Sequence, residues 1–115
     1  MKLLEKDRHI LEHILRYCIK IQHTLDRFGC DAETFLNDSD YRDSVSMNLL
    51  QIGELAGRLS DDYVKNTKAE MDWRAIKNMR NMFAHDYGSM DIERIWETAV
   101  EDIPLLTQYC QKSLI

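Results

Sequence analysis

The amino-acid sequence predicts an all-α fold, an antiparallel helical bundle of about four to five helices in a single domain over residues 1–115. Only one proline and four glycines occur in the chain, which leaves little turn material for a fold with many strands. Leu, Ile, Met, Glu, Lys and Arg are abundant, and these residues favour helices. Apolar residues also recur at helical spacing. Together these observations indicate helices packed around one core.

Two long helices are expected in the first half of the chain. One runs from Leu3 to Phe28, where apolar residues recur over about seven turns, and Gly29 ends it. A short helical connector is expected over 31–37, and the second long helix over 41–59. The second helix carries its apolar residues on one face, namely Val45, Leu49, Ile52, Ala56 and Leu59.

Shorter helical segments follow. Ser60 can cap a helix that runs through about Val64. The helix after it has two candidate starts, because Thr67-x-x-Glu70 has capping-box spacing and Asp72 is a competing N-cap. Its beginning therefore stays open by a few residues.

The last two helices meet at a glycine. Gly88 ends the helix that reaches Tyr87, and Asp91 can cap the next one. Pro104 is predicted to kink this last helix, because proline lacks the backbone N–H that an α-helix needs. Its buried side comprises Ile92, Ile95, Trp96, Ala99, Ile103, Leu106 and Cys110.

Composition restricts the class of protein. Apolar residues make up 44% of the chain and charged residues 30%, a balance typical of globular domains. The formal net charge of −5 argues against a broad, nonspecific nucleic-acid surface. Cys18, Cys30 and Cys110 are odd in number and form no CxxC, so reduced, semi-buried thiols are expected. With no run of 18 apolar residues and no signal peptide, no membrane association and a cytoplasmic location are expected.

The segment from Arg80 to Tyr87 departs from the helical pattern. On a helical wheel, Arg80 and Tyr87 fall within the apolar stripe of Ile76, Met79 and Phe83. An arginine in a buried stripe is costly unless it is paired or lines a cleft. A bland explanation is an ion pair that stabilises the core, with Glu54 or Asp86 as the partner.

A second explanation is catalysis. His85 can give and take a proton near neutral pH, and Arg80 offers a fork of donors for phosphate oxygens, which is what metal-free RNA cleavage requires. The two lie about 140° apart around a straight helix, so they converge only if the helix distorts near His85 or packs against its twofold copy. Arg74 and Lys77 add positive charge nearby and are either RNA contacts or solvated side chains.

Two further patterns carry other interpretations. His9 and His13 belong to an H-x-x-E-H pattern, which occurs in zinc hydrolases, but no third ligand is evident and solvent-facing histidines are the better interpretation. Gly53 and Gly57 lie four residues apart, beside Glu54. In so polar a chain they indicate the close approach of a neighbouring helix or a ligand rather than a membrane dimer.

The motif W-x2-I-x3-R-N-x3-H-x-Y resembles the R-x4-6-H motif of the HEPN ribonucleases and, more narrowly, that of the HepT-type toxins. It is formed here by Trp73, Ile76, Arg80, Asn81, His85 and Tyr87. The similarity extends to Ile52-Gly53-Glu54, Leu59-Ser60, Asp91, Ile95-Trp96 and Ile103-Pro104. Asn78 departs from the pattern, because many relatives have a small residue there.

The resemblance implies a HEPN-like homodimer that cleaves RNA without a metal or cofactor. His85 is then the general acid/base, Arg80 stabilises the phosphorane, and Asn81 orients the phosphate or His85. It also implies an MntA-like nucleotidyltransferase antitoxin that transfers AMP from ATP to Tyr87. Without the resemblance, Tyr87 is an ordinary aromatic residue at a helix end. The rival from another class is a non-catalytic dimeric adaptor or nucleotide-binding module, in which Arg80 and His85 bind a nucleotide or stabilise the interface.

Overall fold

The helical repeat at the beginning of the chain forms α1, Glu5–Phe28, in the computed structural model, which describes residues 3–84 and 91–115. The inward face of α1 is fully buried at Leu11, Ile14 and Ile21. Gly29 has a φ of 93°, which favours glycine, and its N–H donates to a carbonyl of the last helical turn. The predicted end of this helix is therefore confirmed.

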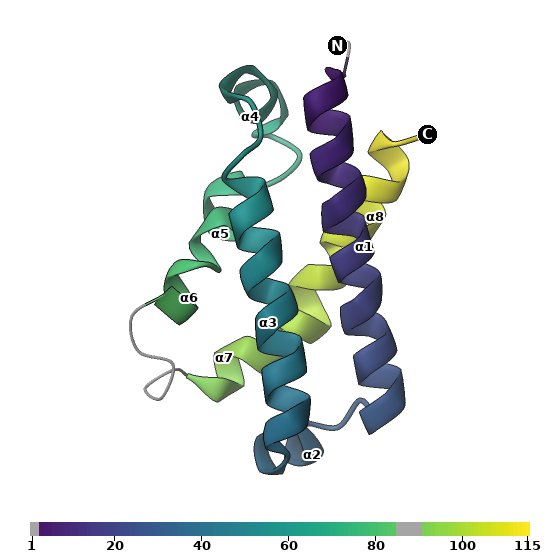
Figure 1. Cartoon of the computed structure of the whole chain (residues 1–115), viewed down its shortest axis with the longest axis vertical. Helices are drawn as coiled ribbons and strands as arrows, with labels where there is room; N and C mark the ends of the chain where they lie inside the picture. The colour runs from purple at the N-terminus through teal and green to yellow at the C-terminus, as the bar shows by residue number, and fades with distance from the viewer. Residues whose placement is uncertain (1–2, 85–90) are drawn as a thin grey trace.

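The chain reverses through α2, Ala32–Asn37, and enters α3, Ser39–Ala56. The carboxylate of Asp38 caps α3 by accepting from the backbone N–H groups of its first turn. Because of this cap, α3 begins before the predicted start at residue 41. In Figure 1, α1 and α3 lie side by side and run in opposite directions, as the predicted antiparallel bundle requires.

A buried carboxylate attaches the next helix, α4, Asp61–Thr67, to α1. Asp7, in the first turn of α1, is only 1% exposed and accepts from the Ser60 backbone N–H at 2.8 Å and from its hydroxyl at 2.7 Å. Ser60 also caps α4, as predicted, by accepting from the Tyr63 N–H. A buried carboxylate is tolerated only when such donors satisfy it, so α1 fixes where α4 begins.

The next helix, α5, Trp73–Asn78, begins after Asp72, whose carboxylate accepts from the Ala75 N–H. The alternative start at Thr67 is wrong. The Thr67 hydroxyl donates to a backbone carbonyl of α4 and accepts from the indole N–H of Trp73 at 2.8 Å, so it is not available as a cap. A further short helix, α6, Asn81–Ala84, follows after two residues.

The last helix is continuous but changes its winding. It consists of α7, Ile92–Glu97, the π-helical segment η2, Thr98–Asp102, and α8, Ile103–Ser113, and Asp91 caps it as predicted. In the π segment the Ile103 N–H reaches the Thr98 carbonyl, five residues back. The sequence predicts a kink at Pro104, and the structure has a π turn that ends at Asp102, two residues before the proline.

The core lies between α1, α3 and the last helix, and the described residues contain no strand. Phe35 and Tyr41 are fully buried, and the Phe35 ring lies 5.1 Å from that of Trp96. Cys18 and Cys110 are buried, and desolvation raises the pKa of these thiols to about 11 and about 12, respectively. Cys30 is exposed, so the expectation of semi-buried thiols was wrong for that residue.

In the part of the chain that the structure describes, no helix has the length and hydrophobicity needed to cross a bilayer.

Candidate active site

The segment that carries the motif is a helix interrupted at Met79 and Arg80. α5 ends at Asn78, α6 begins at Asn81, and the N–H groups of Met79 and Arg80 reach carbonyls only three residues back, at 3.1 and 3.2 Å. Asparagine is unfavourable inside helices, and here the Asn81 side-chain amide donates to the Asn78 side-chain oxygen at 3.4 Å. The prediction of one unbroken helix up to Tyr87 is therefore wrong.

At the interruption, the backbone packs against α3 at Gly53. A Cβ atom at this position would lie 2.7 Å from the Arg80 backbone nitrogen, a distance too short for a real contact, and 3.3 Å from its Cα, which is tight. At Gly57 a Cβ atom would meet its nearest neighbour at 3.4 Å, an ordinary contact. The predicted close approach of a neighbouring helix is confirmed at Gly53, and it is the backbone of Arg80 that approaches.

Arg80 forms an ion pair with Glu54, the residue after that glycine. The guanidinium Nε lies 2.7 Å from the Glu54 Oε1, within hydrogen-bond distance, and 55% of the Arg80 side chain and 37% of the Glu54 side chain remain exposed. Among residues 3–84 and 91–115, no other group is bonded to the Arg80 guanidinium. Glu54 therefore orients the guanidinium at the surface.

The prediction that Arg80 lies in a buried stripe is corrected by this geometry. Trp73, Ile76 and Met79 are buried, as the stripe requires, but Arg80 is exposed. Its backbone does face α3, whereas its long side chain extends along the surface of α3 into solvent. The predicted pairing with Glu54 occurs, but at the surface rather than within the core.

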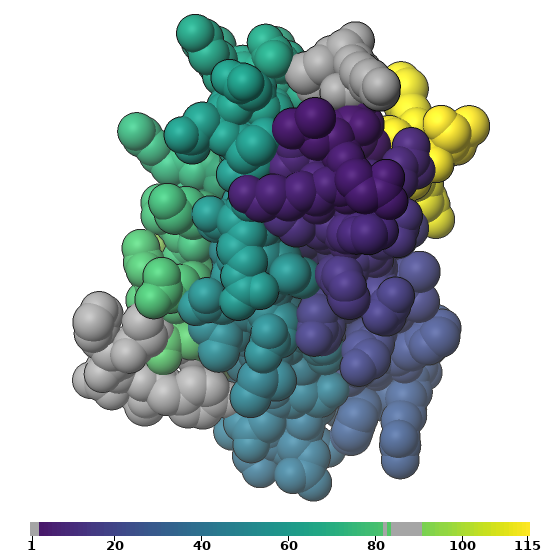
Figure 2. Space-filling view, turned by 45° about the horizontal axis from the view of Figure 1, so that its top comes forward, coloured from purple at the N-terminus to yellow at the C-terminus, as the bar shows by residue number. Residues whose placement is uncertain are grey.

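Arg74, Lys77 and Asn81 lie together on the rim of a groove of about 540 Å³. Its walls are the end of α3, α4, and α5 with the first residue of α6, and the α5 side chains lie next to those of α4 along one edge of the molecule in Figure 2. Lys65 from α4 also lines this groove. Sequence reasoning missed Lys65, because nothing in the local sequence places α4 beside α5.

His85 and Tyr87 lie outside the described residues, as does Asp86. Their predicted roles, and the convergence of Arg80 and His85 on one phosphate, therefore remain predictions.

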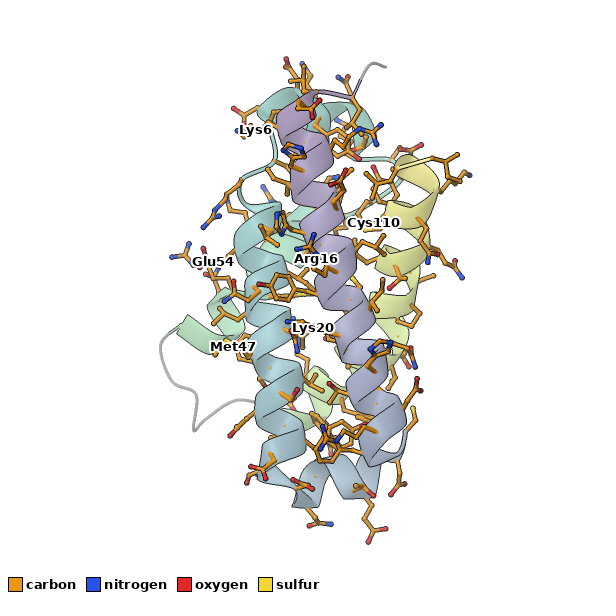
Figure 3. All side chains as sticks on the ribbon, turned by 45° about the vertical axis from the view of Figure 1, so that its right-hand side comes forward. Lys6, Arg16, Lys20, Met47, Glu54 and Cys110 are labelled. Atoms are coloured by element: carbon orange, nitrogen blue, oxygen red, sulfur yellow. The ribbon has the colours of Figure 1, made fainter. Side chains whose placement is uncertain are left out.

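A second surface feature lies beside the ion pair, on the exposed side of α3. Met47 and Leu50 of α3 and Phe83 of α6 line a hollow of about 360 Å³, and Met47 is 56% exposed. Figure 3 shows Met47 and Glu54 on the same side of α3. Glu54 thus lies on the side of α3 that carries this hollow, which Asp43 and Ser46 also line.

The histidines of the H-x-x-E-H pattern, His9 and His13, are both exposed, as expected of solvent-facing residues. His9 Nε2 lies 3.3 Å from a Glu5 carboxylate oxygen. Within the described ranges, no group of three His, Cys, Asp or Glu side chains is arranged to hold a metal ion.

Comparisons with known proteins bear on this site. A family model described as "Ribonuclease HepT-like" matches residues 9–113. "Putative RNase TTE0752" of Caldanaerobacter subterraneus subsp. tengcongensis is 28% identical over 96% of each chain. "Probable ribonuclease HepT" of Thermococcus cleftensis is 35% identical over 64% of this chain and 66% of its own. No solved structure matches.

Proposed function

This chain belongs to the HepT-like ribonuclease family, and from that premise we propose that it is a metal-independent endoribonuclease and the toxin of a toxin–antitoxin module. The observation that carries the proposal is Arg80. Its guanidinium lies at the surface, oriented by Glu54, and the residue that follows it in the chain, Asn81, lines a groove together with Arg74 and Lys77. An exposed, oriented guanidinium is suited to bind a phosphate, whereas a buried structural arginine is not.

The proposed reaction is an attack within the RNA strand. His85 removes the proton from a ribose 2′-hydroxyl, and this oxygen forms a bond to the adjacent phosphorus. The bond from phosphorus to the 5′-oxygen of the next nucleotide breaks, and that oxygen takes up a proton from the imidazolium. The products end in a 2′,3′-cyclic phosphate and a 5′-hydroxyl.

Arg80 stabilises the charge that develops on the phosphorane oxygens, and Asn81 orients the phosphate or His85. Glu54 is a positioning residue in this scheme. It engages Nε and thereby fixes the plane of the guanidinium while the terminal nitrogens face the substrate. Arg74 and Lys77 contact the RNA outside the scissile bond.

We further propose that the active protein is a homodimer. Arg80 and His85 are separated by about 140° on a straight helix, and packing against a twofold copy is one way in which they meet at one phosphate. Met47 is exposed, Leu50 and Phe83 are half-buried, and these apolar side chains line a hollow that suits such an interface. A second copy placed there brings two motifs to one groove.

The proposed regulation is adenylylation of Tyr87 by a small nucleotidyltransferase antitoxin with ATP as the AMP donor. Tyr87 follows His85 by two residues, so a phosphate attached there adds bulk and negative charge beside the catalytic groups. Intact-mass measurement after incubation with that partner and ATP tests this step. An adduct on any other residue excludes Tyr87 from the role.

A dimeric adaptor without catalytic activity is the second candidate. The Arg80–Glu54 ion pair favours it, because a paired arginine can serve the interface alone, and so does the net charge of −5. The adaptor predicts that Arg80 and His85 variants lose dimerisation or nucleotide binding and that no cyclic phosphate product forms.

One experiment separates the two candidates. A defined RNA is incubated in chelator with wild-type protein, His85→Ala, Arg80→Ala and the control Arg94→Ala, which lies outside the motif. We expect the wild type and the control to produce 2′,3′-cyclic phosphate ends and the two motif variants to be slower by about 100-fold or more. Cleavage by both motif variants at the wild-type rate contradicts the catalytic assignment.

A further inference from the structure

The groove between α4 and α5 is set apart by its charge. Among the described residues that line it, Lys65, Arg74 and Lys77 stand against a single carboxylate, that of Asp61. Three cations against one anion is a local excess of positive charge in a chain whose formal net charge is −5. The neighbouring groove of about 620 Å³, on the other side of α5, has the opposite balance, with Arg94 and Lys112 against Glu70, Asp72 and Asp102.

Among the described residues of the α4–α5 groove, the other exposed polar side chains are amides. Asn78 and Asn81 both line it and are exposed. Their mutual hydrogen bond, at 3.4 Å, is long, so each amide keeps donor and acceptor capacity for a ligand. Cations and neutral amides together suit the backbone of a nucleic acid. The cations bind the negatively charged phosphates, and the amides bind phosphate oxygens and sugar hydroxyls.

Among the described residues, the floor of the groove offers no aromatic face on which a base could stack. Trp73 is 3% exposed, and its indole N–H is already bonded to Thr67. Its ring packs inward, 6.0 Å from the ring of Tyr63 and 5.5 Å from that of Tyr109. Stacking on an aromatic face is how proteins bind unstacked bases. The described part of the groove has no such face, so it is suited to contact the backbone of the strand and to tolerate different base sequences.

The groove also has the position and the size expected of a site for a strand. Asn81, which lines the groove, directly follows Arg80 in the chain, so the groove begins one residue away from the arginine proposed to bind the scissile phosphate. The volume of about 540 Å³ is that of a site for one small molecule, which suits a single strand and not a duplex.

We propose that the α4–α5 groove is an extended subsite that binds single-stranded RNA on one side of the scissile phosphate, chiefly through its phosphates. Lys65, on α4, is a member of this subsite although it lies outside the sequence motif. The inference rests on the proposed ribonuclease function. It adds that the substrate is a strand of several nucleotides, recognised there with little regard to base sequence.

The test compares two substrates cleaved at the same site, a dinucleotide and a 12-nucleotide single strand. Lys65→Glu is the principal variant, and Lys112→Glu, which reverses a charge in the neighbouring groove, is the matched control. We expect Lys65→Glu to lower kcat/KM for the longer strand by about tenfold, to reduce its salt dependence, and to leave dinucleotide cleavage unchanged. Both lysines are exposed, so the two variants should retain the wild-type melting temperature, and Lys112→Glu should cleave both substrates normally.

Equal losses on both substrates, or no loss on the longer one, overturn the subsite. A wild-type protein that cleaves neither substrate refutes the proposed function instead. The groove is then tested by the anisotropy of a fluorescent 2′-O-methyl 12-mer, which Lys65→Glu should bind about tenfold more weakly than Lys112→Glu does. Identical binding of the 12-mer by the two variants refutes the subsite, whether or not the protein is a ribonuclease.

Discussion

Within the described residues, the regular α-helical winding is lost between α5 and α6 and between α7 and α8, and the two interruptions of this winding have opposite effects. Between α7 and α8 the π turn keeps the helix continuous and keeps Thr98, Ala99 and Ile103 buried. Between α5 and α6 the helix stops, and Arg80 extends from the break with 55% of its side chain exposed. One irregularity preserves packing, whereas the other presents a charged group to solvent.

The causes of the two interruptions also differ. Pro104 provides a local cause for the π turn, because it has no N–H with which to continue the α-helical ladder. The break at Arg80 contains neither proline nor glycine, and its backbone instead fits against Gly53 of another helix. A break that a neighbouring helix stabilises can therefore position a functional side chain. Here α3 fixes the Arg80 backbone through Gly53 and the Arg80 guanidinium through Glu54.

The largest effect is expected from Gly53→Ala. Its Cβ would lie 2.7 Å from the Arg80 nitrogen, so the motif must move away from α3. We expect a loss of about 1–3 kcal/mol of stability and a decrease in RNA cleavage of about 100-fold, because a small displacement of a catalytic group is sufficient. Gly57→Ala is the control, since its φ of −66° and its nearest contact at 3.4 Å suit an alanine. Full activity in Gly53→Ala would show that the break does not depend on α3.

A smaller effect is expected from Glu54→Gln, which keeps the shape of the side chain and removes its charge. The pair is exposed on both sides, so the free energy of unfolding should change by less than about 1 kcal/mol. We expect kcat to fall by about tenfold with KM nearly unchanged, because the guanidinium is less well oriented. A variant with a lower melting temperature and unchanged kcat would assign Glu54 a purely structural role, and higher activity would make the ion pair inhibitory.

The smallest effect is expected from Pro104→Ala. The new N–H removes the local cause of the π turn, and we expect stability to change by about 1 kcal/mol or less, with unchanged RNA cleavage. Thiol labelling checks whether α8 stays packed. Cys110 is fully buried and its pKa is raised to about 12, so it should stay unreactive while Cys30 labels rapidly. Rapid labelling of Cys110 in the variant would show that packing beyond the π turn depends on the proline.

Elements with local causes could be predicted from the sequence. The end of α1 at Gly29 and the caps at Ser60, Asp72 and Asp91 follow from the residues themselves, and the structure has all four. The cap predicted at Thr67 is absent, because its hydroxyl, although suitably spaced from Glu70, bonds to Trp73 and to a carbonyl of its own helix. Spacing alone cannot show which partner a hydroxyl will have in three dimensions.

Part of the site could be predicted as well. The sequence brings Arg74 and Lys77 together, because they are one turn apart on one helix, and it offered Glu54 as a partner of Arg80. It could not predict that Arg80 is exposed, because the wheel assumes a straight helix and the break depends on α3. Lys65 was missed for the same reason, since its place in the groove depends on how α4 packs.

The buried carboxylate of Asp7 has a consequence for engineering. It fixes Ser60 and so the beginning of α4, the helix that carries Lys65. A segment of α4 and α5 transplanted into another scaffold would therefore lose its geometry unless the opening turn of α1 travelled with it. For the same reason, fusion tags or deletions at the amino terminus can change the measured activity of this protein by displacing α4, even though they lie far along the chain from the motif.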